Sequence, residues 1–388
     1  MESNNLFETI ERVAVDIFSR ESLKKRLETG EPLKIKLGAD PSRPDLHLGH
    51  SVTLRMLRKM QDKGHEIIFV IGDFTGMIGD PSGLNKTRQP LTLEETRSNG
   101  QSYFEQVSKI LDPAKTRITY NSDWLGKMDF AQVLRLAGKY TLARIMERDD
   151  FSNRYASNQP IGLHELFYPL MQGYDSVALN ADVEVGGTDQ TFNLLVGREL
   201  QKDYGKKPQE VITFPLLPGL DGVEKMSKSL DNYIGIDEPP EIMFEKCMKI
   251  PDNILPDYFR LTTDIVEDEY ANILSHDIRQ AHFMYAREIV KIYHGTDAIE
   301  TAEQRYLAIA SGNAPGDMQM ISVSGSRAPI IELLKQAGFA SSNSDARRLI
   351  EGGGIKLDGK TVSDINLIVS CDAIISRGKN RFVKIHIG

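Results

Sequence analysis

The stretch KLGADPSRPDLHLGH, residues 36–50, indicates how the first part of this chain folds. Apolar residues alternate with polar ones from 33 to 37, which is the period of a half-buried strand. The Asp-Pro pair at 40–41 and the Pro-Asp pair at 44–45 then predict a turn. Apolar residues recur at helical spacing from 52 to 60. The sequence therefore predicts a strand, a turn and the start of a helix, in that order.

Two histidines lie at the first turn of this predicted helix. His47 and His50 are three residues apart, so they share one face of the helix. The N–H groups at a helix N-terminus favour anions, and imidazoles can add further donors. A metal site is not expected, because no Cys, third His or carboxylate cluster stands nearby at ligand spacing. We interpret the pair as a phosphate site, with surface or capping histidines as the alternative.

A second motif supports the phosphate interpretation. Residues 225–229 read KMSKS, and turn-prone residues on both sides predict that they form a polar loop. In this order, the two motifs resemble the HIGH and KMSKS motifs of class I aminoacyl-tRNA synthetases. The resemblance implies that His47, His50, Lys225 and Lys228 are the catalytic side chains. The first motif reads HLGH here, an apolar exchange that leaves both imidazoles in place.

The chemistry of amino-acid activation explains why such residues suffice. The substrate's own carboxylate attacks the α-phosphate of ATP and expels pyrophosphate, so no general base is needed. The protein has to position two anions and stabilise the charge that develops on phosphoryl oxygens. Imidazoles at a helix N-terminus suit the α-phosphate, and a loop with two lysines suits the leaving pyrophosphate. Such a loop is expected to close over ATP.

Length and composition favour a globular protein of more than one domain. The chain has 388 residues, of which 40% are hydrophobic and 26% charged. Its two cysteines, Cys247 and Cys371, imply no disulfide framework. The first residues lack the basic and apolar pattern of a secretory signal, and no apolar run is long enough to span a membrane. The expected location is the cytoplasm.

The pattern along the chain predicts three parts. Over 1–220, strand-like runs alternate with helical ones, which favours an α/β, Rossmann-like parallel sheet that binds ligands beyond the carboxyl ends of its strands. Residues 124–166 read as a helical insertion into that catalytic domain. The region 221–320 holds the KMSKS loop and then an all-helical pattern. Gly and Pro at 311–317 predict a linker to a small α+β module at 328–388.

The last part, 328–388, has its own pattern and charge. Its nine Lys or Arg against six Asp or Glu give +3, whereas the rest of the chain carries −11. Two amphipathic helices are followed by a hairpin that turns at Asp358-Gly359. Ser342 and Asp345 can form a capping box for the second helix. The segment resembles the S-four-like RNA-binding domain, and the alternative is an accessory domain with a solvated basic face.

Three more motifs resemble the bacterial tyrosyl-tRNA synthetases across nearly the whole chain. They read IGDPSG at 78–83, YPLMQGYD at 168–175 and GGTDQ at 186–190. The resemblance implies that tyrosine is activated with ATP and Mg²⁺ to tyrosyl-adenylate and then transferred to the 3′ end of tRNA(Tyr). It also implies that 221–320 contacts the anticodon and that the protein is a homodimer, with 124–166 as the candidate interface.

The resemblance assigns roles residue by residue. One predicted helix carries Tyr168, Gln172 and Asp175 at spacings of four and three residues, so the three side chains share one face of it. The residues implied to bind tyrosine are Asp80, Tyr168, Gln172, Asp175 and Gln190, with Asp175 on the phenol. Those implied to bind ATP are Asp40, Thr53, Asp189 and Lys228, and those implied to bind RNA are Arg347 and Arg348.

The sequence departs from the pattern of the tyrosyl-tRNA synthetases at two places. Lys36 stands where the better-known branch of the family has a tyrosine that shares the phenol, and 191–193 reads TFN where that branch has Trp-Gly-Asn. Both features resemble a second bacterial branch and leave the phenol's second hydrogen-bond partner undefined.

Three other classes of protein are alternatives. A tryptophanyl-tRNA synthetase has a similar core but lacks a tail like 328–388. A nucleotidyltransferase of the superfamily would not need that tail, and an RNA-binding protein with a decayed core would be expected to have lost motif residues.

Overall fold

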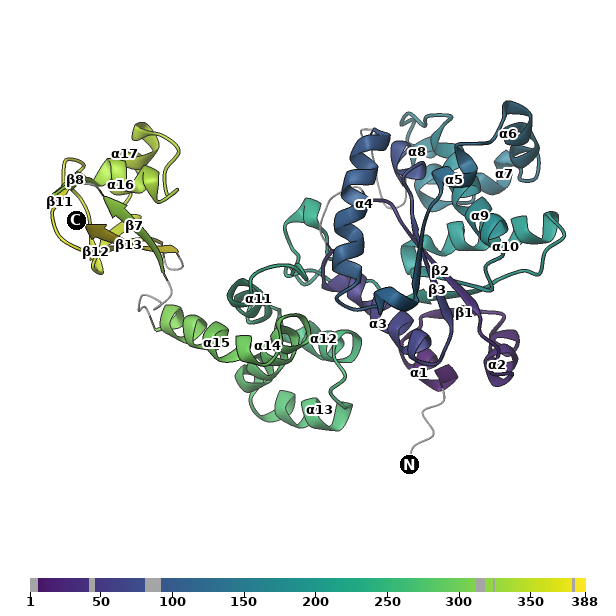
Figure 1. Cartoon of the computed structure of the whole chain (residues 1–388), viewed down its shortest axis with the longest axis horizontal. Coiled ribbons are helices and arrows are strands. Elements are labelled where there is room, and N and C mark those ends of the chain that lie inside the picture. Colours follow the sequence, from purple (N-terminus) through teal and green to yellow (C-terminus); the bar gives the residue numbers. More distant parts are fainter. Residues whose placement is uncertain (1–5, 42–45, 81–91, 312–317, 324, 379–380) are drawn as a thin grey trace. The chain divides into compact units, whose positions relative to one another are not determined.

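A computed structural model describes residues 6–41, 46–80, 92–311, 318–323, 325–378 and 381–388 (Figure 1). The predicted turn at 44–45, the end of the glycine-rich motif at 81–83 and most of the predicted linker at 311–317 lie outside these residues. The chain divides into two units. The first comprises Met1–Glu238 and Lys246–Tyr285, and the second comprises Pro239–Glu245 and Ala286–Gly388.

A six-stranded sheet forms the centre of the first unit, in the order β1-β6-β5-β2-β3-β4. All neighbouring strands are parallel except β1, which pairs antiparallel with β6 at the edge. The chain runs from β2 through β3 to β4 on one side and then returns through β5 and β6 on the other, so the order reverses between β2 and β5. The strands are β1 (Asp16–Phe18), β2 (Lys34–Ala39), β3 (Glu66–Ile71), β4 (Thr116–Tyr120), β5 (Val183–Gly187) and β6 (Glu210–Phe214).

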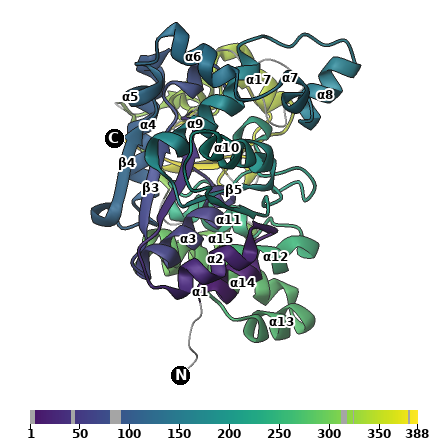
Figure 2. The same cartoon turned by 90° about the vertical axis from the view of Figure 1, so that its right-hand side faces the viewer.

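The inner strands are buried on both faces, as a parallel sheet covered by helices requires. In β3 the five residues from Ile67 to Ile71 are at most 1% exposed. Helices α9 and α10 pack against each other beside this sheet (Figure 2). A Cβ atom on Gly173 of α9 would lie 3.1 Å from the backbone nitrogen of Gly197 on α10, so a glycine permits the close approach. The helices concerned are α1 (Leu6–Val13), α2 (Arg20–Glu28), α3 (Leu48–Asp62), α4 (Leu93–Val107), α9 (Tyr168–Leu179) and α10 (Thr191–Asp203).

The segment 124–166 is mainly helical, as its pattern predicts. Residues Leu136, Ile145 and Phe151 bury their side chains with Leu170 of α9 and Leu200 of α10. The insertion is therefore anchored on the same helix pair that lies beside the sheet. Its helices are α5 (Ser122–Leu125), α6 (Phe130–Ala137), α7 (Leu142–Ile145) and α8 (Asp149–Ala156).

The region after the KMSKS motif is helical up to residue 310. Among the described helices, none combines the length and apolar character that crossing a membrane requires. The helices are α11 (Pro240–Cys247), α12 (Leu255–Thr262), α13 (Glu267–His276), α14 (Ile278–His294) and α15 (Asp297–Ala310).

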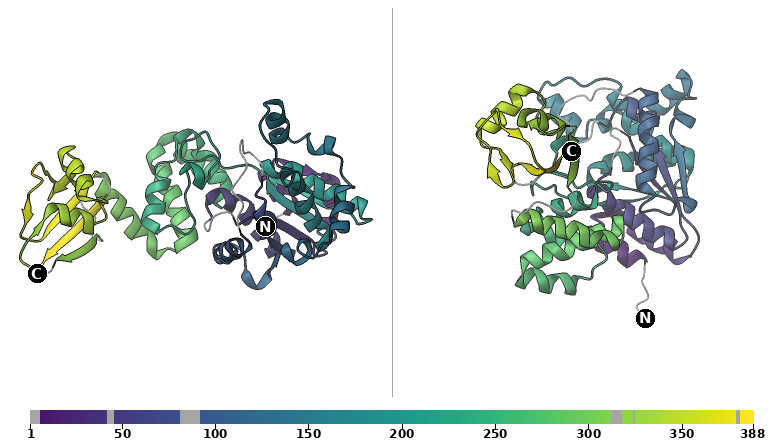
Figure 3. Two further views of the ribbon diagram at one scale, coloured as in Figure 1. Left: turned by 90° about the horizontal axis from the view of Figure 1, so that it is seen from above. Right: turned by 60° about the vertical axis from the view of Figure 1, so that its left-hand side comes forward.

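The tail forms a mixed sheet with two helices (Figure 3). Its strand order is β10-β9-β12-β13-β7, and β7 pairs parallel with β13, so the sheet takes in residues ahead of 328. Asp358 and Gly359 have φ of 45° and 79°, which confirms the predicted two-residue turn. The elements are β7 (Gln319–Val323), β8 (Ala328–Pro329), α16 (Ile330–Gln336), α17 (Asn343–Glu351), β9 (Ile355–Leu357), β10 (Lys360–Thr361), β11 (Ile368–Val369), β12 (Ala373–Arg377) and β13 (Arg381–Ile387).

The predicted cap of α17 forms in part. The Ser342 hydroxyl accepts the backbone N–H of Asp345 at 3.2 Å. The carboxylate of Asp345 accepts the backbone N–H of Ser341 at 3.0 Å, one residue ahead of the expected partner. Arg347 and Arg348 both lie exposed on this helix.

Candidate active site

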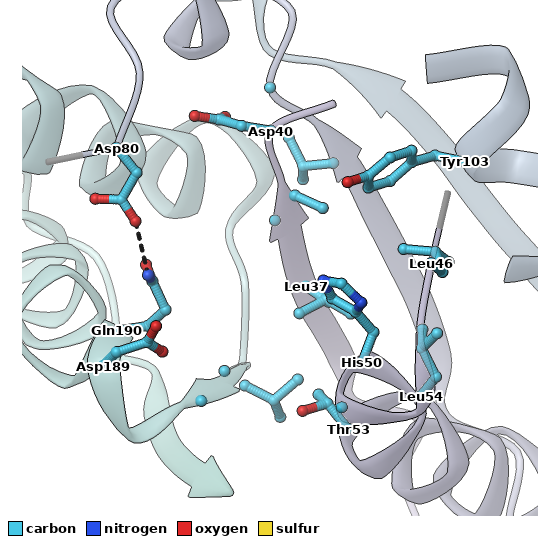
Figure 4. A pocket seen from close by; sticks show the side chains of 18 of the residues that line it. Leu37, Asp40, Leu46, His50, Thr53, Leu54, Asp80, Tyr103, Asp189 and Gln190 are labelled. Atoms are coloured by element: carbon cyan, nitrogen blue, oxygen red, sulfur yellow. Dashed lines mark hydrogen bonds between the residues drawn. The ribbon is translucent and has the colours of Figure 1, made fainter. Parts of the chain in front are cut away.

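A cavity of about 620 Å³ opens where β2 and β5 end, at the point of the sheet where the strand order reverses (Figure 4). It collects residues that lie far apart along the chain, from both signature motifs and from α9. The residues named from the sequence that line it are Asp40, His47, His50, Thr53, Asp80, Tyr168, Gln172, Asp175, Asp189, Gln190, Lys225 and Lys228. Arg347 and Arg348 belong to the other unit.

The two histidines lie against each other at the start of α3. His47 is the N-cap residue, and the ring centroids of His47 and His50 are 3.9 Å apart. The backbone N–H of His47 donates to Nδ1 of His50 at 3.2 Å, which places the proton of a neutral His50 on Nε2. Burial and the nearby Lys228 lower the pKa of His50 to about 4. Burial and the neighbouring His50 also lower the pKa of His47, so both rings are uncharged at neutral pH. A neutral imidazole can donate one hydrogen bond.

The chain just after the KMSKS loop is held beside these histidines by backbone hydrogen bonds. The N–H of Leu48 donates to the carbonyl of Ile234 at 2.9 Å, and the N–H of Ile236 donates to the carbonyl of Leu46 at 3.1 Å. Nζ of Lys225 donates to Oδ2 of Asp189 at 2.7 Å. Lys225 thus fixes the loop to the segment after β5, and residues 234–236 fix the following chain to the first motif, which explains how the two motifs form one site.

One wall of the cavity is rich in acceptors. Asp40 accepts hydrogen bonds from the hydroxyls of Tyr168 at 2.9 Å and Thr75 at 2.7 Å. Burial outweighs these bonds and raises the pKa of Asp40 to about 7. Oε1 of Gln172 is buried and has no hydrogen-bond partner among the described residues. A cationic ligand with several donors, such as an ammonium group, would satisfy this wall.

Asp80 and Gln190 form a second contact of the cavity. Nε2 of Gln190 donates to Oδ2 of Asp80 at 2.7 Å (Figure 4). Asn193 donates to Oε1 of Gln190 at 3.1 Å, and the guanidinium of Arg148 lies 3.5 Å from Asp80. The sequence reasoning did not single out Arg148, which comes from the helical insertion and carries no motif.

Asp175 lies deep on the inward face of α9. Its carboxylate accepts the indole N–H of Trp124 at 2.8 Å and a longer bond of 3.4 Å from Asn121. Burial raises the pKa of Asp175 to about 7, although Lys36 and the two donors act in the opposite direction. Trp124 and Asn121 were missed by the sequence reasoning. The available signal was the chain's only tryptophan, at position 124.

Lys36 is not among the residues that line the cavity. It is 0% exposed, and its ammonium lies 2.8 Å from Oε1 of Glu184. Lys36, at the position where the better-known branch has a tyrosine, therefore forms a buried ion pair with Glu184 beneath the site.

Two family models match the chain. The model of class I tRNA synthetases for tryptophan and tyrosine matches residues 28–310, and the S4 domain model matches residues 329–374. The chain is 48% identical to the tyrosine–tRNA ligase of Deinococcus radiodurans, over 98% of this chain and 96% of the relative. It is 50% identical to that of Chlorobaculum tepidum, over 97% of this chain and 94% of the relative.

Solved structures share the fold. A C-terminally truncated mitochondrial tyrosyl-tRNA synthetase from Aspergillus nidulans superposes with a TM-score of 0.65 at 23% identity, over 79% of this chain and 95% of that one. The tyrosyl-tRNA synthetase from Archaeoglobus fulgidus, complexed with L-tyrosine, gives 0.61 at 24% identity, over 78% of this chain and 99% of that one. These likenesses confirm the predicted α/β architecture.

Proposed function

This chain belongs to the class I tRNA synthetases for tryptophan and tyrosine, and we propose how its cavity carries out their reaction on tyrosine. The reaction is that of a tyrosine–tRNA ligase. ATP activates tyrosine to tyrosyl-adenylate with release of pyrophosphate, and the tyrosyl group then passes to the 3′ end of tRNA(Tyr). The observation that carries the choice of tyrosine is the buried Asp175, an acceptor of the kind that a phenol hydroxyl needs.

Tyrosine is proposed to lie with its phenol on Asp175 and its ammonium at the acceptor-rich wall. Gln172 and Tyr168 come from the same face of α9 as Asp175, and the unpartnered Oε1 of Gln172 is available to an ammonium. Asp80 adds a carboxylate beside them, and Gln190 approaches from the end of β5. This arrangement places the substrate carboxylate toward the histidines, where the α-phosphate is to be attacked.

ATP is proposed to bind across the start of α3. The neutral His50 can donate from Nε2 to phosphoryl oxygens without competing for a proton. Thr53, one turn further along α3, lines the same cavity, as does Asp189 for the ribose. Because Lys225 already bonds to Asp189, ribose binding and the position of the KMSKS loop are expected to influence each other.

Mg²⁺ is proposed to arrive with ATP. Among the described residues, no three His, Cys, Asp or Glu side chains are grouped so that they could hold a metal ion. Mg²⁺ commonly uses substrate phosphates and retained water as ligands, with one or two carboxylates. The ATP phosphates and water would supply most of its ligands, and the ion would neutralise charge on the phosphates.

The tRNA is proposed to contact the S4 domain through its exposed basic residues, among them Arg347 and Arg348. The helical region after the KMSKS loop is proposed to contact the anticodon. A cytoplasmic location is proposed on the ground of the tRNA substrate.

We expect Asp175→Ala to remove most of the discrimination against phenylalanine. A buried carboxylate left without the phenol proton is costly, so the site should reject the substrate that lacks the hydroxyl. Phenylalanine rejection by tyrosyl-tRNA synthetases is the established case of this effect. The ratio of kcat/KM for tyrosine over phenylalanine, measured by pyrophosphate exchange, should fall by about a hundredfold or more. Asp203→Ala, an exposed carboxylate on α10, is the matched control. An unchanged ratio would contradict the assignment of Asp175 and with it the proposed binding mode.

The helical insertion is proposed to form a homodimer interface. Large apolar side chains lie exposed on α6, α7, α8 and the segment after them. Apolar patches of this kind mark association surfaces. They are Phe130 (76% exposed), Leu134 (56%), Leu142 (63%), Tyr155 (72%) and Leu163 (78%).

Light scattering should therefore give about twice the 43.5 kDa mass of one chain. Phe130→Asp with Leu134→Glu should yield a folded monomer, because both side chains are already exposed in one chain. Val266→Asp, another exposed apolar position, should leave the dimer intact. A wild-type monomer, or a dimer that survives the double substitution, would overturn this interface.

A further inference from the structure

The ammonium of Lys36 is surrounded by protein acceptors beneath the active site. Its Nζ donates to the carbonyl of Gln172 at 3.0 Å and to the hydroxyl of Ser176 at 2.9 Å, and lies 2.8 Å from Oε1 of Glu184. An ammonium has three donors, and here three acceptors surround it. Lys36 therefore cannot donate to a substrate without giving up one of these bonds.

The acceptors come from the two elements that frame tyrosine. Gln172 and Ser176 lie on consecutive turns of α9, and Glu184 lies on β5, next to β2 in the sheet. Ser176 passes a hydrogen bond on to Oε2 of Glu184 at 2.9 Å, and Gln209 donates to the same oxygen. The Lys36 side chain thus ties β2 to the turn of α9 that carries Gln172 and Asp175.

The positive charge of Lys36 also acts on the protonation of Asp175. Among the described residues, the ionisable groups that act on Asp175 are Lys36 from β2, Glu184 from β5 and Asp40 just after β2. Trp124 and Asn121 contribute neutral donors. Lys36 is the one cation in this set, so it opposes the protonation that burial and the two carboxylates favour.

We propose that Lys36 is a positioning residue for tyrosine selection: it holds the α9 turn in place and favours the ionised form of Asp175, the acceptor for the phenol, without contacting the substrate. This inference rests on the proposed role of Asp175. Burial holds the pKa of Asp175 near 7 even with Lys36 present. Loss of the cation should therefore protonate Asp175 within the physiological range, which gives the proposal a pH signature.

The test uses two variants with opposite expected effects in the full-length chain. Glu184→Gln leaves an amide oxygen for Lys36 and removes a negative charge, so the pKa of Asp175 should fall. Lys36→Met with Glu184→Gln removes the cation without stranding a buried carboxylate, so the pKa should rise. The readout is the tyrosine-to-phenylalanine ratio of kcat/KM in pyrophosphate exchange from pH 6 to 8.5. Taking the ratio cancels the amino and carboxyl titrations that both substrates share.

In the wild type the ratio should increase with pH, with a midpoint near 7. The midpoint should lie lower in Glu184→Gln and higher in the double variant, whose ratio at pH 7 should fall about tenfold. Lys34→Met, on the same strand but half-buried, should match the wild type. Folded variants with unshifted midpoints would overturn the role of Lys36. If Asp175→Asn retained the full ratio, the proposed role of Asp175 would be the part that fails.

Discussion

Lys228→Ala is expected to slow tyrosyl-adenylate formation by about a hundred- to a thousandfold while tyrosine affinity stays nearly unchanged. Lys228 lines the cavity on the KMSKS loop, beside the histidines, and is proposed to meet pyrophosphate as its charge develops. Removal of one oriented donor to such a transition state costs about 3 kcal/mol. An interaction made mainly in the transition state appears in the rate and not in ground-state binding.

Single-turnover experiments measure the rate of adenylate formation, and equilibrium dialysis measures the affinity for tyrosine. His50→Ala should behave in the same way, because its Nε2 donor is proposed for the same phosphates. Lys202→Ala, a half-exposed lysine of α10 that pairs with Glu199, provides the control for loss of a positive charge. Abolished tyrosine binding in Lys228→Ala would mean that the loop shapes the tyrosine pocket and not the phosphate site.

Removal of the S4 domain after residue 311 is expected to leave adenylate synthesis intact and to reduce tRNA charging by orders of magnitude. The hydrophobic core of this domain draws on residues between 321 and 387, so the cut removes a complete core. Every residue proposed to bind tyrosine or ATP lies in the other unit. The loss should appear in tRNA affinity, because the phosphate contacts of the basic residues disappear.

Pyrophosphate exchange on the truncated chain measures adenylate synthesis, and tRNA charging measures transfer to tRNA. The slope of log Kd for tRNA against log salt concentration should also become shallower. Within the full chain, Arg347→Ala with Arg348→Ala should change affinity and slope in the same direction by less. Charging that survives truncation would show that the domain does not bind tRNA, and lost exchange would show that it supports the catalytic fold.

The motifs and their order were readable from the sequence because each depends on a short stretch of chain. A strand, a turn and a helix start can be predicted at 33–60 from the alternation and spacing of apolar residues alone, and β2 and α3 form there. The Asp358-Gly359 turn was predictable for the same reason, since its backbone conformation depends on two residues. The resemblance then supplied the roles of side chains that no local pattern could assign.

The contacts that define the site required the tertiary structure. Trp124 and Asp175 are 51 residues apart, and Tyr168 and Asp40 are 128 apart, so no local period relates them. Their meeting depends on the tertiary structure, because the strand order brings β2 and β5 side by side and the chain after β4 packs against α9. The buried pair of Lys36 and Glu184 is the clearest case. By sequence Lys36 stands where a related branch has a tyrosine that shares the phenol, and only the tertiary structure shows that its ammonium bonds to Gln172 and Glu184 instead.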